Sequence, residues 1–209
     1  MSALSAKGTR LNKRGLETRQ VLLATALECL AEGGPESVSA SLIAREAGVT
    51  WGTVQHQFGD VDGLWAAVLE HVLTDTPTMR PRLPDSPVLA DRVHAIIELL
   101  WAAMDLHTSR AIHHLRLALP RQREELESEY PATAAAIAHF DAAWTQIVEH
   151  AFDGFDLDPV RLARVRSLLP GAMRGIHNEQ FLSTYTDPSE AITGLSEAII
   201  SYLEKGTTP

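Results

Sequence analysis

Apolar residues recur at three- and four-residue steps along most of the chain, which is the spacing of one face of an α-helix. Leu23, Ala26, Leu27 and Leu30 follow this spacing inside a first helix expected over residues 16–31. The same pattern predicts helices over residues 60–73, 88–106, 108–119, 131–152, 159–182 and 187–205, and the charged stretch over 121–129 is also expected to be helical. No segment alternates apolar and polar residues as a strand does, so the sequence predicts an all-α protein.

Two short helices with a glycine between them are expected over residues 39–58. Ser39 and Thr50 have the hydroxyl side chains that are favoured at helix N-caps, one before each short run. Gly48 lies where a tight turn requires a left-handed backbone. Helices this short are not stable alone, so they need the first helix to pack on. The arrangement predicts a helix-turn-helix whose second helix enters the major groove of DNA.

A proline-rich stretch divides the chain. Pro77, Pro81, Pro84 and Pro87 fall within a short segment, and no helix tolerates that density. We expect a connection between two lobes here. The predicted organisation is an N-terminal basic arm and helix-turn-helix DNA-binding domain over residues 1–60, a connecting helix and Pro-rich loop over 61–87, and a second helical domain over 88–209.

The composition favours a globular cytoplasmic protein. Hydrophobic residues make up 45% of the chain, which is enough for a substantial core. No apolar run is long enough to span a membrane, and the N-terminal residues lack the apolar stretch of a signal peptide. We therefore expect no membrane partner. The single cysteine, Cys29, excludes an internal disulfide and is interpreted as a small core residue.

The net charge of −9 is unfavourable for a DNA-binding protein, but the charges are distributed unevenly. Residues 1–20 contain five basic residues against Glu17 alone, whereas the rest contains 13 basic and 26 acidic residues. Such an asymmetry indicates a basic arm that binds an anion on an otherwise acidic body. The alternative is a solvated, disordered tail. The helix-turn-helix favours DNA contact.

The second short helix holds the side chains expected to read DNA. Gln55 can pair with an adenine edge, and Gly52 lets the backbone come close to the duplex. Trp51 either packs beneath the helix or contacts a sugar or a thymine methyl group, and Arg45 is either a DNA contact or a solvated charge. Val54 and Phe58 are expected to face the core. The predicted DNA-binding residues are Arg10, Lys13, Arg14, Ser39, Ser41, Arg45, Thr50, Trp51, Gly52, Thr53, Gln55, His56 and Gln57.

These residues divide into two groups by the part of the duplex they are expected to contact. Basic and small polar groups suit the phosphate backbone, whereas the exposed side chains of the second helix suit base edges. Backbone contacts are expected from Arg10, Lys13, Arg14, Thr50 and Gln57. Most base-edge contacts are expected from Ser41, Trp51, Thr53, Gln55 and His56.

Three features occur together in residues 18–72: a long first helix, the motif A-x-x-A-G-V-T-x-G-T-V over 44–54, and F-x-x-x-x-x-L over 58–64. The segment reads TRQVLLATALECLAEGGPESVSASLIAREAGVTWGTVQHQFGDVDGLWAAVLEHV. It resembles the N-terminal domain of the TetR family of one-component transcriptional regulators. The rest of the chain resembles the family only in its length and all-helical pattern.

Three positions depart from the family's pattern. Gln55 stands where the family usually has Tyr, Gln57 where it usually has His, and Val61 where it usually has Lys. The family's residues mostly bind phosphates, so these replacements remove a cation and an aromatic hydroxyl from the expected backbone contacts. The basic arm can compensate by reaching along the duplex.

The resemblance also implies a homodimer in which the last two long helices of each subunit form a four-helix bundle. The apolar stripes of these helices suit that role, although one face of each helix must also serve the internal core. Such a dimer predicts a roughly palindromic operator. The expected interface residues are Leu162, Val165, Leu169, Met173, Ile176, Ile192, Leu195, Ile199 and Tyr202.

A ligand cavity among the middle helices is a further implication, since ligand occupancy would change the spacing of the two recognition helices and weaken DNA binding. Aromatic and polar residues of these helices are the candidates, although several also suit plain core positions. If the face with Arg110 lines the cavity, an anionic ligand with an apolar body is favoured. The candidates are Trp101, Met104, His107, Arg110, His114, Phe140 and Trp144.

Other function classes have less support. His107, His113 and His114 cluster near Asp105, which makes a metal-responsive regulator an alternative, but no cysteine lies nearby. The sequence contains none of the common nucleotide-binding, nucleophile or metalloprotease motifs, so we expect no enzyme, no catalytic residue and no cofactor. A helical protein-interaction module without DNA specificity is the third possibility. The sequence favours a dimeric repressor that binds an operator in double-stranded DNA and is released by a small apolar or amphipathic effector.

Overall fold

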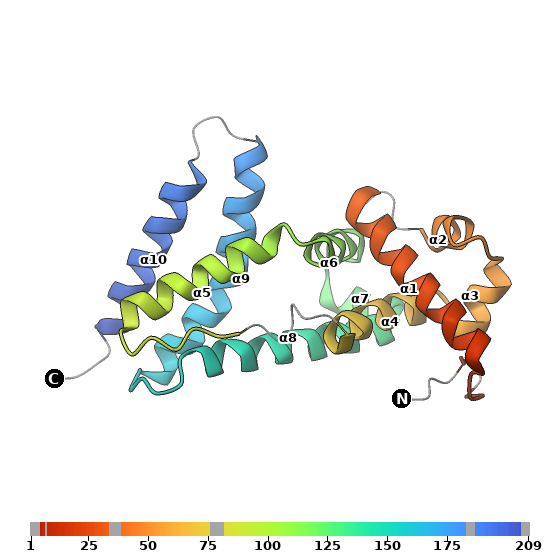
Figure 1. The fold of residues 1–209 in the computed structure, drawn as a ribbon, viewed down its shortest axis with the longest axis horizontal. Helices are drawn as coiled ribbons and strands as arrows, with labels where there is room; N and C mark the ends of the chain where they lie inside the picture. Colours follow the sequence, from red (N-terminus) through yellow and green to blue (C-terminus); the bar gives the residue numbers. More distant parts are fainter. Residues whose placement is uncertain (1–4, 7, 34–38, 76–81, 183–186, 206–209) are drawn as a thin grey trace. The chain divides into compact units, whose positions relative to one another are not determined.

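Ten helices form the regular structure of residues 5–6, 8–33, 39–75, 82–182 and 187–205, which the computed structural model describes (Figure 1). No strand occurs in these ranges, so the all-α prediction is confirmed. In chain order the helices are α1 (Lys13–Gly33), α2 (Ala40–Glu46), α3 (Trp51–Phe58), α4 (Val61–Asp75), α5 (Leu89–Met104), α6 (His107–Ala118), α7 (Arg123–Glu129), α8 (Pro131–Ala151), α9 (Pro159–Leu182) and α10 (Pro188–Glu204).

The first helix differs most from its predicted bounds. It begins at Lys13 because the Asn12 side chain accepts a hydrogen bond from the Gly15 N–H at 2.8 Å, as an N-cap does. Helix α9 continues through Pro170, which has no backbone N–H to donate within the helix. Pro77 and Pro81 of the proline-rich stretch lie outside the described ranges, and so does Lys7, one of the five basic residues counted in residues 1–20.

The described residues before α1 form a closed turn, unlike the solvated, disordered tail given as the alternative for this segment. The Ser5 N–H donates to the Thr9 carbonyl at 2.8 Å, and the Thr9 N–H donates to the Ser5 hydroxyl at 3.2 Å. The Ala6 N–H donates to the His56 carbonyl at 3.2 Å. These hydrogen bonds satisfy backbone groups that a free arm would leave to water, and they hold the turn against α3.

The chain divides into two compact units, each with its own core. The first comprises Met1–Arg80 and Leu106–Ala143, and the second comprises Pro81–Asp105 and Trp144–Pro209. Residues 106–143 thus belong with the N-terminal helices, whereas the sequence placed them in the C-terminal domain. The reason is that α6 packs along α1, a pairing that apolar spacing alone does not specify.

The core of the first unit is built mainly from α1, α2, α3, α4 and α6. Leu22 and Leu30 of α1, Val54 of α3, Leu64 of α4 and Leu115 of α6 are all fully buried. Each such side chain contributes about 1.5 to 3 kcal/mol by leaving water. The short helices α2 and α3 are therefore held by packing on longer neighbours, as the sequence predicts.

The core of the second unit takes up residues that the sequence assigned to a dimer interface. Val165, Leu169 and Met173 of α9 and Ile199 of α10 are buried against α5 inside this unit. These four interface predictions are therefore wrong. The apolar stripes were identified correctly, but they face the chain's own core.

The other five predicted interface residues are half-buried. They are Leu162, Ile176, Ile192, Leu195 and Tyr202. Among the described helices, none is long and apolar enough to cross a membrane.

Candidate nucleic-acid interface

The turn between α2 and α3 is built around Gly48. This residue has φ +65°, and its N–H donates to the Arg45 carbonyl at 3.0 Å. The Val49 N–H donates to the Ala44 carbonyl at 2.9 Å, so the last carbonyls of α2 are satisfied as the chain turns. The predicted left-handed glycine is confirmed, and residues with a side chain rarely adopt this conformation.

Both short helices begin at the predicted N-caps. The Ser39 hydroxyl accepts a hydrogen bond from the Leu42 N–H at 3.3 Å. The Thr50 hydroxyl accepts from the Thr53 N–H at 3.4 Å, and the two threonine hydroxyls lie 3.2 Å apart. Thr50 is exposed at the N-terminus of α3, where backbone N–H groups and the helix dipole favour an anion.

Helix α3 has one buried face and one open face. Val54 and Phe58 are buried in the core of the first unit, as the sequence predicts. Gly52, Gln55 and His56 are exposed. A short helix that turns an amide and an imidazole toward solvent presents hydrogen-bonding groups suited to base edges in the major groove.

Trp51 and Thr53 lie at the border between these two faces. Both are half-buried, and Trp51 packs against the core of the first unit. The packing alternative for Trp51 is therefore supported. A DNA sugar or methyl group could contact only the part of the Trp51 side chain that stays exposed.

Gln57 is placed differently from its prediction. Only 4% of the residue is exposed, and its side-chain Nε2 donates to the Gly15 carbonyl at 3.0 Å. A buried amide that is already hydrogen-bonded cannot reach a phosphate. The predicted backbone contact from Gln57 is therefore wrong: its Nε2 is directed at a carbonyl of α1, and its Oε1 is buried without a hydrogen-bond partner among the described residues.

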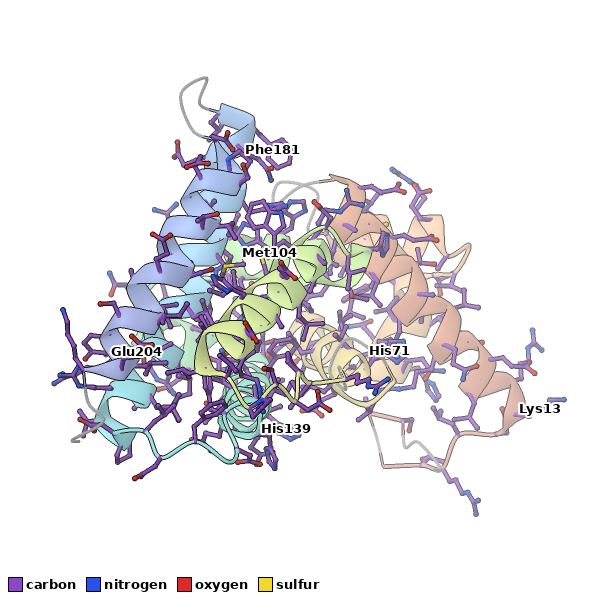
Figure 2. The ribbon with its side chains drawn as sticks, turned by 60° about the vertical axis from the view of Figure 1, so that its left-hand side comes forward. Lys13, His71, Met104, His139, Phe181 and Glu204 are labelled. Carbon is purple, nitrogen blue, oxygen red and sulfur yellow. The ribbon has the colours of Figure 1, made fainter. Side chains whose placement is uncertain are left out.

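The predicted cations are at the start of α1. Arg10, Lys13 and Arg14 are exposed, and no acidic residue occupies the first turn of the helix. Figure 2 shows Lys13 at this end of α1. Cations oppose the dipole at a helix N-terminus, at a cost of about 0.3 to 1 kcal/mol each. An external anion would offset that cost.

Helix α2 offers two exposed polar residues, Ser41 and Arg45. The Arg45 guanidinium pairs with Glu46 at 3.0 Å, and both side chains are at least half exposed. An exposed pair of this kind contributes about 0 to 1 kcal/mol, so the guanidinium can exchange its partner for a phosphate.

The last turn of α3 is held by contacts that the sequence analysis missed. Arg19 was counted there only among the basic residues of the arm. In the structure its Nη1 donates to the Gln57 carbonyl at 2.9 Å, and its guanidinium lies 4.4 Å from the centre of the Phe58 ring. Burial lowers the pKa of Arg19. Nothing in the local sequence distinguishes this arginine from the exposed cations near it.

Gly63 is a second missed residue. A Cβ atom at this position of α4 would lie 2.0 Å from the Phe58 carbonyl oxygen, far inside contact distance. The glycine therefore allows α4 to begin directly against the end of α3. An isolated glycine inside a predicted helix was the available signal, because it is unfavourable unless packing requires it.

Asp62, next to Gly63, joins α4 to α8 within the first unit. Its carboxylate accepts hydrogen bonds from the Ala132 N–H at 2.9 Å and the Thr133 N–H at 2.7 Å. The Thr133 hydroxyl donates back to the Asp62 carbonyl at 3.1 Å. Asp62 thus caps a helix that is distant in sequence, and this tertiary cap has no signature in local sequence.

The predicted effector residues divide between the two units. Trp101, Met104 and Trp144 belong to the second unit, and the other four belong to the first. The Trp144 indole N–H is buried without a hydrogen-bond partner among the described residues. Trp101 packs edge-on against His177, with ring centres 5.5 Å apart.

The four candidates in the first unit have different surroundings. His107 is the first residue of α6, and Arg110 is exposed. His114 Nδ1 lies 2.6 Å from the Leu30 carbonyl, and the Arg116 guanidinium lies 5.7 Å from the Phe140 ring centre. Within the described ranges, no three histidine, cysteine or carboxylate residues gather in a way that could hold a metal ion.

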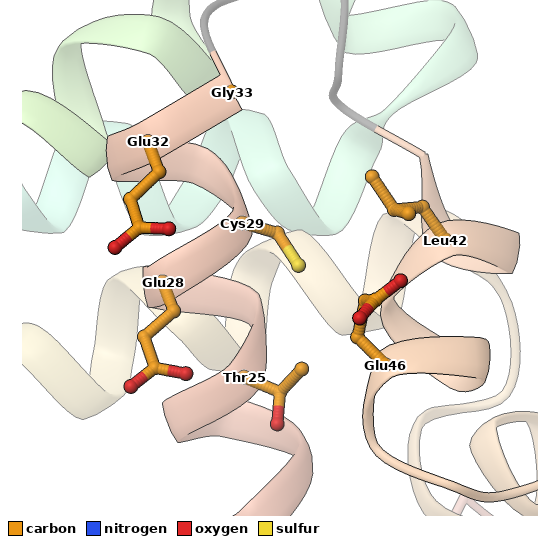
Figure 3. A pocket seen from close by; sticks show the side chains of 7 residues that line it. All are labelled: Thr25, Glu28, Cys29, Glu32, Gly33, Leu42 and Glu46. Atoms are coloured by element: carbon orange, nitrogen blue, oxygen red, sulfur yellow. The ribbon is translucent and has the colours of Figure 1, made fainter.

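An open pocket of about 380 Å³ lies between α1 and α2 (Figure 3). Its lining contains three carboxylates, and none of the predicted effector residues takes part. The lining residues are Thr25, Glu28, Cys29, Glu32, Gly33, Leu42 and Glu46.

Comparisons with known proteins agree with this geometry. The profile of the family described as "Bacterial regulatory proteins, tetR family" matches residues 22–68. The HTH-type transcriptional regulator BetI of Burkholderia thailandensis is 33% identical over 90 residues. That match covers 42% of this chain and 46% of the relative, so the chain spans about half the length of the curated relatives it matches.

Two solved structures share the fold over most of the chain. A transcriptional regulator of Rhodococcus sp. Rha1 has a TM-score of 0.65 and 20% identity, over 91% of this chain and 99% of that chain. NalD, the secondary repressor of the MexAB-OprM multidrug efflux pump in Pseudomonas aeruginosa, has a TM-score of 0.62 and 22% identity, over 90% and 98%. The segment matched by the family profile contains the helix-turn-helix described above, so residues 22–68 resemble the tetR family of bacterial regulatory proteins.

Proposed function

We propose that the chain is a dimeric transcriptional repressor that binds a palindromic operator and is released by a small apolar or amphipathic effector. The main support is the division of α3 into two faces, with Val54 and Phe58 buried and Gln55 and His56 open. A helix held in this way can lie in the major groove without losing its core. NalD is described as a repressor, which favours repression over activation.

The proposed contacts fall into two groups. Arg10, Lys13, Arg14 and Thr50 contact the phosphate backbone. Base edges are read mainly by Gln55 and His56, with smaller contributions from Ser41, Thr53 and the exposed part of Trp51. The whole chain has a net charge of −9, which repels the duplex. The cations at the start of α1 are the groups that attract it.

A homodimer through the outward side of α9 would supply two recognition helices. Leu168, Phe181 and Leu182 are 57%, 72% and 81% exposed, although large apolar side chains usually avoid water. Figure 2 shows Phe181 near the end of its helix. A second copy related by two-fold symmetry would cover this face on both subunits and would read a palindromic site.

The proposed effector binds the second unit beside Trp144. A buried indole N–H without an acceptor is unfavourable by about 1 to 3 kcal/mol, and an acceptor atom on a ligand would remove that cost. Trp101 and Met104 belong to the same unit and would suit an apolar ligand body. A compound with these properties should raise the melting temperature and weaken DNA binding. Trp144→Phe should reduce both effects.

Selection of bound DNA from a random pool tests the proposal. A palindromic consensus is expected, and Gln55→Ala should then cost roughly 1 to 3 kcal/mol on the preferred site and relax the base choice there. An equal loss on unrelated DNA would assign Gln55 to the phosphate backbone. A pool without any enriched sequence would contradict the proposed function and favour a protein-interaction module.

A further inference from the structure

We propose that Arg19 and Gln57 are positioning residues for DNA specificity: together they clamp the last turn of α3 to α1 and fix the direction in which Gln55 and His56 point. The inference rests on the proposed function. It concerns two residues that do not touch DNA themselves.

The clamp consists of two hydrogen bonds that run in opposite directions. Arg19 Nη1 donates to the Gln57 carbonyl at 2.9 Å, and Gln57 Nε2 donates to the Gly15 carbonyl at 3.0 Å. Gly15 and Arg19 are one turn apart, so both bonds come from the same face of α1. Two bonds to one residue restrict rotation and tilt, which a single bond would not.

Helix α3 needs such a restraint because it has only eight residues. A helix of this length has little stability of its own. Its N-terminal end is fixed by the turn at Gly48 and by the Thr50 cap. At the other end, the Gln57 carbonyl is one of the last acceptors that the helix itself leaves unpaired, and Arg19 supplies the donor.

Arg19 is suited to this role and poorly suited to phosphate contact. Its guanidinium lies over the Phe58 ring and points at the C-terminal end of α3, where the helix dipole is negative. Burial at this place lowers its pKa, but a guanidinium remains protonated at neutral pH. The arginine therefore stabilises α3 as a charge directed at the helix end.

Removal of the clamp should affect specific and non-specific binding differently. Gln55 and His56 directly precede the clamped residue, so a tilt of the last turn displaces the groups proposed to read bases. Phosphate contacts from the flexible side chains of Lys13 and Arg14 tolerate such a tilt. Loss of the clamp should thus reduce sequence preference and leave the number of phosphate contacts unchanged.

The test uses the full chain, the DNA that it selects from a random pool, and an unrelated duplex over a series of salt concentrations. Arg19→Met keeps the apolar stem and removes the donor. It should weaken binding to the selected DNA about tenfold. The affinity for the unrelated duplex should not change, nor should the salt slope, which is the dependence of log affinity on log salt concentration. The matched control, Arg14→Met, should weaken both duplexes equally and reduce the salt slope by about one.

Gln57→Met is the second variant, because it removes the other bond without changing charge. It should reproduce the loss of specificity, and the double variant should be no worse than either single one, since the two bonds act as one unit. Arg19→Lys should restore part of the preference.

A salt slope reduced by Arg19→Met would identify a phosphate contact and overturn the proposal. An unchanged sequence preference in both variants would also overturn the proposal. If Arg19→Met does not fold, the result for Gln57→Met decides.

Amide hydrogen exchange separates the clamp from the proposed function because it needs no DNA. Arg19→Met should accelerate exchange over residues 55–58 by about tenfold, while the amides of α9 remain unchanged. Unchanged exchange in the last turn of α3 would overturn the clamp itself. If the wild type enriches no sequence, the proposed function fails and the specificity claim fails with it, whatever the exchange shows.

Discussion

Helix α3 exposes Gly52, Gln55 and His56, whereas α9 exposes Leu168 and Phe181. Each of these faces is left open by its own compact unit, but their chemistry differs. The polar face suits a hydrated, anionic surface such as DNA. The apolar face suits a protein surface that excludes water. The comparison teaches that an open face alone does not identify a partner, since the partner follows from the groups that the face presents.

The largest expected effect concerns the support of the polar face. Gly63→Ala would place a Cβ atom 2.0 Å from the Phe58 carbonyl oxygen, so α4 or the end of α3 must shift. We expect a loss of about 3 kcal/mol in the free energy of unfolding and loss of operator binding. Thermal unfolding and DNA titration measure these effects.

Gly194→Ala is the control for that prediction, because a Cβ atom there meets nothing within 4 Å. It should leave the free energy of unfolding unchanged or raise it by up to about 1 kcal/mol, since alanine is the better helix former. If the two variants unfolded alike, the close approach of α4 to α3 would be refuted.

The next largest effect concerns the apolar face. Leu168→Glu places a charge on the proposed dimer interface and should weaken dimerisation by about 2 kcal/mol or more. Sedimentation equilibrium should show a shift toward monomer. Leu117→Glu is a matched control because Leu117 is 52% exposed, close to the 57% of Leu168, but lies on α6 in the other unit. If the two variants dimerised equally well, α9 would not form the dimer interface.

A smaller effect concerns the contact between Asp62 of α4 and the start of α8. Asp62→Ala removes the acceptor of the Ala132 and Thr133 N–H groups and should cost about 1 to 2 kcal/mol of unfolding free energy. Chemical denaturation measures it. Glu70→Gln, on the same pair of helices, alters an exposed contact with His139 and should cost less than about 0.5 kcal/mol. A cost for Asp62→Ala no greater than that of Glu70→Gln would show that the cap contributes little.

The smallest effect concerns Cys29, which lies between α1 and α2 with Glu46 facing it (Figure 3). Burial, and then the carboxylates of Glu46, Glu28 and Glu32, raise the pKa of its thiol. Alkylation by iodoacetamide should therefore require a higher pH than for a free cysteine. Glu46→Gln should move the profile back toward lower pH, and an unchanged profile would exclude a contribution from that carboxylate.

The raised pKa of Cys29 also predicts a small pH dependence of stability. Above the pKa of the unfolded thiol, the unfolded chain loses a proton that the folded chain retains. The contribution is thus fully present at lower pH and decreases as the pH rises through the folded pKa. Cys29→Ser should flatten this part of the stability profile.

Local features of the chain were largely predictable. Periodic apolar residues identified most of the described helices, and Gly48 identified the turn of the helix-turn-helix, because these features depend on neighbours within one turn. Predictions failed where a residue's partner lies far along the chain. Gln57 was expected to donate to a DNA phosphate, but in the structure its Nε2 donates to the Gly15 carbonyl in the interior.

The sequence by itself determined which segments are helical and which side of each is apolar, since propensity, caps and breakers act over a few residues. Only the tertiary structure decided what each apolar side covers. The stripe of α9 packs on its own unit, α6 joins α1, and Arg19 turns inward to α3. The physical reason is that burial is non-directional: an apolar stripe requires a partner but does not specify which one.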